Sequence, residues 1–395
     1  MKKIMSLSLA IMLLVSIIPA MPAQAATQTI TYLTEAVYDS IGVYSEGYVW
    51  VKQGDTFKYL DAKGKVVIDL SNKKYVGKNE YIAEVGDFHD GLALIAVAKE
   101  ATEEDFEYDP YRYYIDTKGN IALKSAQIEK KPSGSPRISP TAISGFFSPF
   151  SEGVTVTDTR PEDGNVAIIK PDGSVKWYSG SMDYYWYTQG LLCAGSYVDG
   201  ELLWGYVDKT YKKVISYKYE EARPFNQNLA PVKIKGKWGF INKSGKTVIK
   251  AQFEDFGVQD KTYSYQVFND GLATVKKNGK WGAIDKKGKT VVSFKYDNPV
   301  IFSNGLACVK GSDGKYTYID KKGKTVIKTK YADANYFSKD GIAIVGNNGT
   351  YKLINSKGKQ IGTKTWKFDG TNVSGMTPDI LKYKIGNKWG IAKIG

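Results

Sequence analysis

The chain has 395 residues, of which 42% are hydrophobic and 24% are charged. This balance excludes an intrinsically disordered protein and permits a sizeable core. Aromatic residues reach 13%, and 40 glycines separate short β-prone runs, a composition typical of all-β proteins. The net charge of +14 is uneven, because residues 1–200 carry 19 basic and 25 acidic side chains whereas residues 201–395 carry 36 and 16. This asymmetry suggests an anionic partner for the second half.

The N-terminal segment has the three parts of a secretory signal peptide. Lys2 and Lys3 give it a positive start, residues 4–18 are almost entirely apolar, and residues 23–25 read Ala-Gln-Ala, a small-x-small cleavage site. A retained anchor helix is the alternative, which the shortness of the apolar run disfavours. We therefore predict a signal peptide over residues 1–25. The mature protein is then expected to be secreted, associated with the cell wall and without a membrane span.

A repeated unit accounts for most of the remaining sequence. Trp238 and Trp281 lie 43 residues apart, and the equivalent Tyr316 and Tyr351 follow at spacings of 35. Each unit runs through a Gly-containing turn, a Leu-Ala-x-Val strand and a Trp-Gly strand. A hairpin turn of the type Asp-Lys-Lys-Gly-Lys and a Thr-Val-Ile strand follow. We predict three to four short strands per unit and no helix.

The segments Lys-Trp-Gly-Phe-Ile at 237–241 and Lys-Trp-Gly-Ala-Ile at 280–284 resemble the WG (KWG) repeat family of bacterial proteins. The resemblance covers nearly all of residues 40–395 and implies a tandem β-repeat without established catalytic residues. Residues 26–190 are predicted to be degenerate repeats, with an acidic insertion at 103–109 and a Pro/Ser-rich one at 131–149. Residues 191–395 are predicted to be well-formed, Lys-rich repeats. In this framework each Trp fills core and each Gly permits close packing, at Trp204, Gly205, Trp238, Gly239, Trp281, Gly282, Trp389 and Gly390.

The units have the size of propeller blades. Counting turn glycines or their equivalents gives eight units, and residues 380–394 and 38–47 look like complementary parts of one more. We predict an all-β fold of tandem repeats, arranged as a propeller-like ring of about eight units. An open solenoid of stacked β-hairpins is the alternative, because nine units would exceed the usual four to eight blades.

Catalytic groups are sparse. The one histidine, His89, occupies a turn position, which argues against triad or zinc chemistry, so we expect no metal and no cofactor. A carbohydrate-active enzyme using carboxylates is the alternative. The aspartates at one repeat position interchange with asparagine, which suits turn capping better than catalysis. They are Asp61, Asp116, Asp208, Asp285 and Asp320, with Asn242 and Asn355 as substitutes.

The cysteines lie at equivalent positions of non-adjacent units, as Cys193 and Cys308. Such positions are expected to be far apart in a regular array, so a disulfide between them is disfavoured. We predict two free, buried thiols.

The favoured function is that of an exported, non-catalytic binding or scaffold module. Lysines of the hairpin turns would fall on one edge of any regular array and form an anion-binding rim. They are Lys243, Lys246, Lys286, Lys287, Lys289, Lys321, Lys322 and Lys324. The expected partner is an anionic cell-envelope polymer, a glycan or another protein, and not a nucleic acid. Two alternatives stay open: a lysine edge that only prevents aggregation, and aromatics of residues 184–187 that stack on sugars instead of packing in the core.

Overall fold

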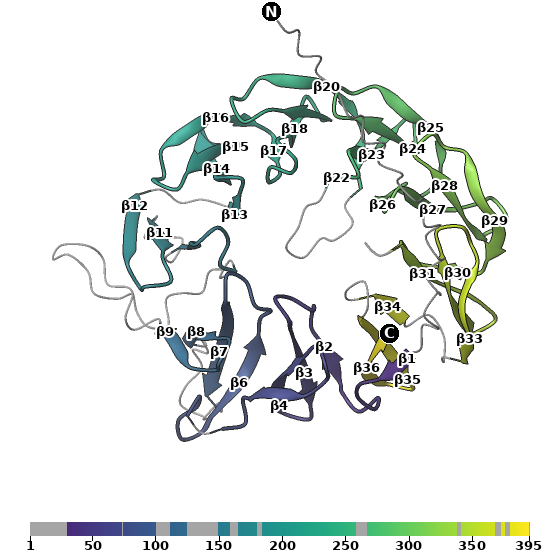
Figure 1. The fold of residues 1–395 in the computed structure, drawn as a ribbon. Coiled ribbons are helices and arrows are strands. Elements are labelled where there is room, and N and C mark those ends of the chain that lie inside the picture. The colour runs from purple at the N-terminus through teal and green to yellow at the C-terminus, as the bar shows by residue number, and fades with distance from the viewer. Residues whose placement is uncertain are drawn as a thin grey trace, which may run out of the picture.

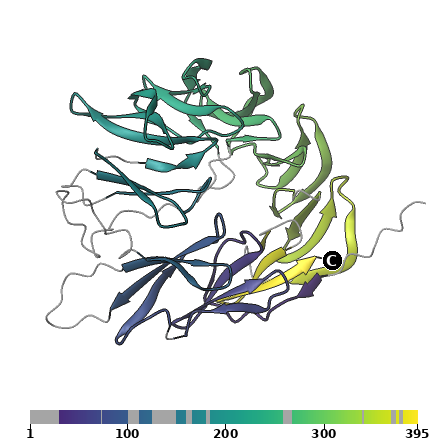
Figure 2. The same cartoon turned by 60° about the vertical axis from the view of Figure 1, so that its left-hand side comes forward.

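The computed structural model describes residues 30–72, 74–99, 111–124, 149–158, 165–179, 184–257, 267–337, 341–367, 373–375 and 380–394. Every helix or strand among these residues is a β-strand, and the strands form nine antiparallel sheets. The sheets follow one another around a ring, as Figure 1 and the rotated view of Figure 2 show. The predicted signal peptide, the acidic insertion and residues 131–148 of the Pro/Ser-rich insertion lie outside the described residues.

Each sheet is called a blade, and its strands are named a to d from the centre of the ring outward (Figure 1). Blade 1 consists of β2 (Ser40–Ile41), β3 (Tyr48–Gln53), β4 (Thr56–Asp61) and β5 (Val66–Asp69). Blade 2 consists of β6 (Glu80–Val85), β7 (Leu92–Lys99), β8 (Tyr111–Asp116) and β9 (Ile121–Lys124). The described part of blade 3 consists of β10 (Thr155–Asp158), β11 (Asn165–Ile169) and β12 (Val175–Ser179). Blade 4 consists of β13 (Tyr184–Thr188), β14 (Leu191–Val198), β15 (Glu201–Asp208) and β16 (Lys213–Tyr219).

The second half of the ring repeats this plan. Blade 5 consists of β17 (Glu221–Ala222), β18 (Ala230–Ile234), β19 (Lys237–Ile241) and β20 (Thr247–Phe253). Blade 6 has its strand a in two pieces, and consists of β21 (Asp255–Phe256), β22 (Phe268–Asn269), β23 (Leu272–Lys277), β24 (Lys280–Asp285) and β25 (Thr290–Tyr296). Blade 7 consists of β26 (Phe302–Ser303), β27 (Leu306–Lys310), β28 (Tyr316–Asp320) and β29 (Thr325–Tyr331). Blade 8 consists of β30 (Asp333–Ala334), β31 (Ile342–Asn347), β32 (Thr350–Asn355) and β33 (Gln360–Lys367).

Blade 9 joins the two ends of the chain. It consists of β34 (Val373–Gly375), β35 (Ile380–Ile385), β36 (Lys388–Ile394) and, as its outer strand, β1 (Ile30–Tyr32). In Figure 1 the purple β1 lies beside the yellow β36. The split unit expected from the sequence is therefore a complete blade, and the ring has nine blades, one more than the eight predicted. The strand that completes it is β1; residues 38–47 instead lead into blade 1.

Hydrophobic clusters lie between neighbouring blades and close the ring. One packs Val232 and Ile241 of blade 5 against Cys193 of blade 4. Another packs Ile391 of blade 9 against Val49 and Leu60 of blade 1. The described residues form nine such clusters, one for each pair of neighbours. Because the last blade packs on the first, the predicted propeller-like ring is confirmed and the open solenoid is wrong.

An aromatic pair recurs at five of these blade contacts and explains the phenylalanine that opens the following repeat. Tyr206, on strand c of blade 4, packs its ring against Phe225 of blade 5, and its hydroxyl donates to the Arg223 carbonyl at 2.8 Å. Ring centroids in the equivalent pairs lie between 4.8 and 5.3 Å apart, a favourable spacing. The other pairs are Tyr59–Phe88, Tyr114–Phe150, Phe240–Phe268 and Tyr318–Phe337.

The Trp-Gly step lies where strand d bulges over strand c. Trp238 pairs with Phe253 and Phe240 with Ile249, so strand d carries two extra residues opposite Gly239. A Cβ on Gly239 would lie 2.6 Å from the Ala251 nitrogen. The same backbone approach occurs at Gly205 and Gly282, whereas Gly390 faces the Tyr383 ring. Trp238 and Trp281 are buried, and Trp204 and Trp389 are half-buried.

Candidate anion-binding face

The hairpin turn between strands c and d is built around one side-chain oxygen. In blade 6, Asp285 Oδ1 accepts the backbone N–H groups of Lys287 and Lys289, both at 2.9 Å. Gly288 takes the positive φ that closes the turn. Equivalent oxygens cap the turns at Asp61, Asp116, Asp208, Asn242, Asp320 and Asn355. An amide oxygen serves as well as a carboxylate, which explains why Asp and Asn interchange.

Asp208 allows a test of this capping role. The Thr210 hydroxyl, followed by the turn amides, lowers the pKa of Asp208 against the opposing effect of burial. A depressed folded-state pKa adds stability that is present above the unfolded pKa of about 3.9 and is lost as the pH falls through the folded value. We expect Asp208→Ala to cost about 1 kcal/mol at pH 7, since the turn amides lose their acceptor.

The matched variant Asp208→Asn keeps the acceptor, as Asn242 does in blade 5. We expect it to unfold at nearly the wild-type denaturant midpoint at pH 7, and to lose less stability than wild type between pH 4 and pH 3. Urea unfolding at both pH values measures this. Equal losses in the Ala and Asn variants at pH 7 would contradict the capping role.

The c–d turns lie at the same end of the blades as the a–b turns, because strands alternate in direction. We call this end of the ring the c–d face.

The eight predicted rim lysines lie on this face. Lys243 donates to the Gln189 carbonyl of the preceding blade at 2.8 Å, and Lys321 donates to the Asp270 carbonyl at 2.8 Å. These two lysines are half-buried and help to join blades. The other six rim lysines are exposed: Lys246, Lys286, Lys287, Lys289, Lys322 and Lys324.

At the opposite end, which we call the b–c face, several lysines pair with carboxylates. There Lys233 contacts Glu221 at 2.6 Å, and Lys280 contacts Asp297. Lys388 contacts Asp39 in the same way. Among the described residues, by contrast, the six exposed rim lysines of the c–d face form no ion pair. In the part of the chain that the structure describes, the rim lysines of blades 5–7 therefore present unpaired positive charge on the c–d face, as Lys235, Lys237 and Lys315 do on the b–c face.

The aromatic segment 184–187 is packed against its neighbours. Tyr187 is buried, and its hydroxyl donates to the Asp208 carbonyl at 3.0 Å. The Tyr185 ring lies 5.3 Å from the Trp204 ring and 5.9 Å from the Trp186 ring. The Arg223 guanidinium lies 5.4 Å from the Tyr185 centroid. These contacts favour packing over sugar stacking for this segment.

The single histidine is a turn residue. His89 pairs its backbone with Leu92 across a turn whose central residues, Asp90 and Gly91, have positive φ. Burial lowers the pKa of His89, and the carboxylates of Glu46 and Asp90 oppose that shift. No group of three or more metal-ligating side chains occurs among the described residues.

The two cysteines lie in blades 4 and 7 and are free and buried, as predicted. Burial raises the pKa of Cys308 to about 12 and that of Cys193 further. Neither thiol is therefore ionised at neutral pH.

One position that the sequence analysis did not single out is Lys352. It follows Tyr351 and replaces the glycine of the Trp-Gly step in blade 8, and it lines a pocket between blades 7 and 8. In the sequence, the position could have been recognised because a charged residue stands where the Trp-Gly units have glycine.

Comparison with known proteins agrees with the architecture. The solved structure titled "Crystal structure of the eukaryotic initiation factor" matches with a TM-score of 0.54 at 10% identity, covering 90% of each chain. The Pan2 WD40 domain of Neurospora crassa matches at 9% identity over 93% of this chain and 96% of that one, with a TM-score of 0.34. Hsv2p of Kluyveromyces lactis matches at 12% identity over 59% and 86%, with a TM-score of 0.33. No curated protein matches the sequence.

The ring of blades and the first of these matches define the class: the protein is a nine-bladed β-propeller. The model of the WG-containing repeat matches residues 31–57, 204–238, 238–281, 281–316 and 316–351. These five segments are WG-containing repeats, which confirms the resemblance drawn from the Trp-Gly segments. No helix among the described residues is long and apolar enough to cross a membrane.

Proposed function

We propose that this repeat module is non-catalytic and binds an anionic polymer on its c–d face, over blades 5–7. The observation that carries the proposal is the set of six exposed lysines that lack ion pairs among the described residues. The aspartates nearest to them cap turns, which supports binding over carboxylate catalysis. For a secreted protein, the polymer would be an acidic polysaccharide or a phosphate-bearing glycopolymer of the cell envelope.

Binding of this kind sums many weak contacts. Each exposed lysine gains little from a single anion in water. A polymer that spans several turns releases a counterion for each charge that a lysine neutralises, so its affinity falls steeply with salt. Because the turns repeat from blade to blade, one polymer can contact several of them.

The test replaces five rim lysines with glutamine, at Lys246, Lys287, Lys289, Lys322 and Lys324. We expect at least tenfold weaker binding to polygalacturonate or poly(glycerol phosphate) at low salt. The slope of log affinity against log salt should fall by about 3 to 5. Calorimetry across a salt series measures both quantities.

The matched control removes five lysines from the b–c face: Lys235, Lys237, Lys276, Lys277 and Lys315. It changes the net charge equally and should retain most of the affinity. Salt-insensitive binding, or the same loss in both variants, would refute the proposal.

A platform for protein partners is the second candidate. It is supported by the propeller fold, which presents two broad faces of turns (Figure 2). Binding to a folded acidic protein that exceeds binding to both polymers would favour this candidate.

A further inference from the structure

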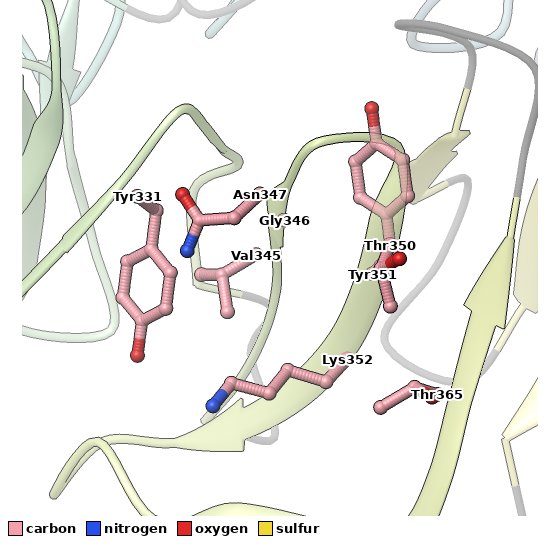
Figure 3. Close-up of a pocket in the computed structure, with 8 residues that line it drawn as sticks. All are labelled: Tyr331, Val345, Gly346, Asn347, Thr350, Tyr351, Lys352 and Thr365. Carbon is pink, nitrogen blue, oxygen red and sulfur yellow. The ribbon is translucent and has the colours of Figure 1, made fainter.

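A pocket of about 150 Å³ lies at the contact between blades 7 and 8, towards the b–c face and away from the rim lysines. Figure 3 shows the rings of Tyr331 and Tyr351 on either side of Val345, with Lys352 below them. The Lys352 Nζ lies 5.8 Å from the Tyr331 ring centroid. Asn347, Thr350 and Thr365 complete the polar part of the lining, and the remainder is largely apolar.

The pocket lies where blade 8 departs from the repeat. In blades 5, 7 and 9, a lysine on strand b lies over the aromatic ring that begins strand c, as Lys233 does over Trp238. In blade 8 that strand b position is Gly346, and a Cβ there would lie 2.5 Å from the Tyr351 ring. The ring therefore lies across the glycine. The lysine of this blade stands on strand c instead, as Lys352.

Blade 1 shows how a lysine at this strand c position is paired with a carboxylate. Lys58 is the equivalent residue there, and its ammonium group lies 3.6 Å from the Asp69 carboxylate on the adjacent strand d. In blade 8, Thr365 of strand d lines the pocket beside Lys352, and no ion pair of Lys352 occurs among the described residues. The nearby Asp333 carboxylate accepts the Tyr351 hydroxyl at 3.2 Å.

We propose that this pocket binds a small monocarboxylate with a six-membered ring, whose carboxylate takes the place that Asp69 holds beside Lys58. A cavity of about this volume accommodates a benzene-sized body. The apolar surfaces of Val345 and Tyr331 suit the ring, and the Lys352 ammonium and the Thr365 hydroxyl can donate to the carboxylate. The Asn347 amide oxygen accepts the Ala332 N–H at 2.8 Å, which leaves its NH₂ group as the donor. This site is independent of the polymer-binding proposal, because it lies towards the other face.

The experiment titrates the full protein with sodium benzoate and with sodium glucuronate, observed by ligand NMR and calorimetry. The two probes share the carboxylate and differ in an aromatic or a sugar ring. Benzamide is the neutral control. We expect at least one of the two carboxylates to bind at millimolar concentration. If benzoate binds, benzamide should bind at least tenfold more weakly. Lys352→Gln should weaken the carboxylate binding at least tenfold.

Lys58→Gln, at the same position of blade 1, is the matched protein control and should leave the affinity unchanged. A circular dichroism spectrum and an unfolding midpoint close to wild type show that each variant is folded. Thr365→Val provides a second test at an exposed position, with an expected loss of about threefold. The proposal is overturned if neither carboxylate binds at concentrations up to roughly 10 mM, which would already correspond to very weak affinity. Unchanged binding in the Lys352 variant, or benzamide binding equal to that of benzoate, overturns it as well.

Discussion

Replacing Gly239 with valine is expected to destabilise the protein by about 3 kcal/mol, because the new side chain forces strand d of blade 5 out of its bulge. A Cβ at this position would lie 2.6 Å from the Ala251 nitrogen and 2.7 Å from the Ile249 carbonyl oxygen, and both are backbone atoms. Ile249 is paired with Phe240, and Ala251 lies in the bulge between the paired Ile249 and Phe253, so a shift of strand d disturbs this pairing. Chemical unfolding monitored by tryptophan fluorescence measures the loss.

Blade 7 supplies the matched comparison. Thr317 occupies the glycine position there, and its hydroxyl donates to the Ile327 carbonyl, which is equivalent to that of Ile249. We therefore expect Gly239→Thr to be less destabilising than the isosteric valine by about 1 kcal/mol. Thr317→Val should cost about 1 kcal/mol by losing the same bond. Equal effects of threonine and valine at position 239 would show that the hydroxyl does not compensate for the crowding.

Removing β1 is expected to lower stability by about 3 kcal/mol and to promote self-association. The strand pairs with β36 over Ile30–Tyr32 and leads into Thr34, whose carbonyl accepts the Tyr383 hydroxyl at 2.6 Å. The Thr34 hydroxyl also accepts the Ile391 N–H at 3.0 Å. Several hydrogen bonds at about 1 kcal/mol each are lost together. The exposed edge of β36 becomes a template for another chain.

The comparison uses a chain that starts at residue 36 and a control that starts at residue 30 and keeps β1. Thermal unfolding and light scattering after size-exclusion chromatography measure the two effects. Equal melting temperatures and a monomeric state for both chains would show that β1 does not close the ring.

The repeating unit could be derived from the sequence because its causes are local. Asp285 caps its own turn, Gly288 supplies the positive φ, and the run from Trp281 to Ile284 is the short, continuously buried segment of a strand that is covered on both faces. Each of these features is decided within about ten residues. The strands, the turns, the buried thiols and the structural role of the Trp-Gly step followed from them.

The number of blades and the closure of the ring depended on contacts between residues that lie far apart in the chain. Eight units could be counted from turn glycines and the two ends indicated one more, but only the pairing of β1 with β36 shows which segment completes it. The charge on the rim lysines was visible in the sequence, whereas their lack of ion pairs was not. The ion pairs on the other face join residues 12 or more positions apart, such as Lys388 with Asp39.

The sequence by itself therefore determined a tandem β-repeat with capped, Lys-rich turns, because turn chemistry and short β-prone apolar runs act between near neighbours in the chain. Only the tertiary structure decided that nine blades close into a ring, that six lysines on the c–d face keep their charge uncompensated, and that Lys352 lines a pocket. Each of these depends on which blade packs against which, and that is set by long-range pairing and by the hydrophobic clusters between blades.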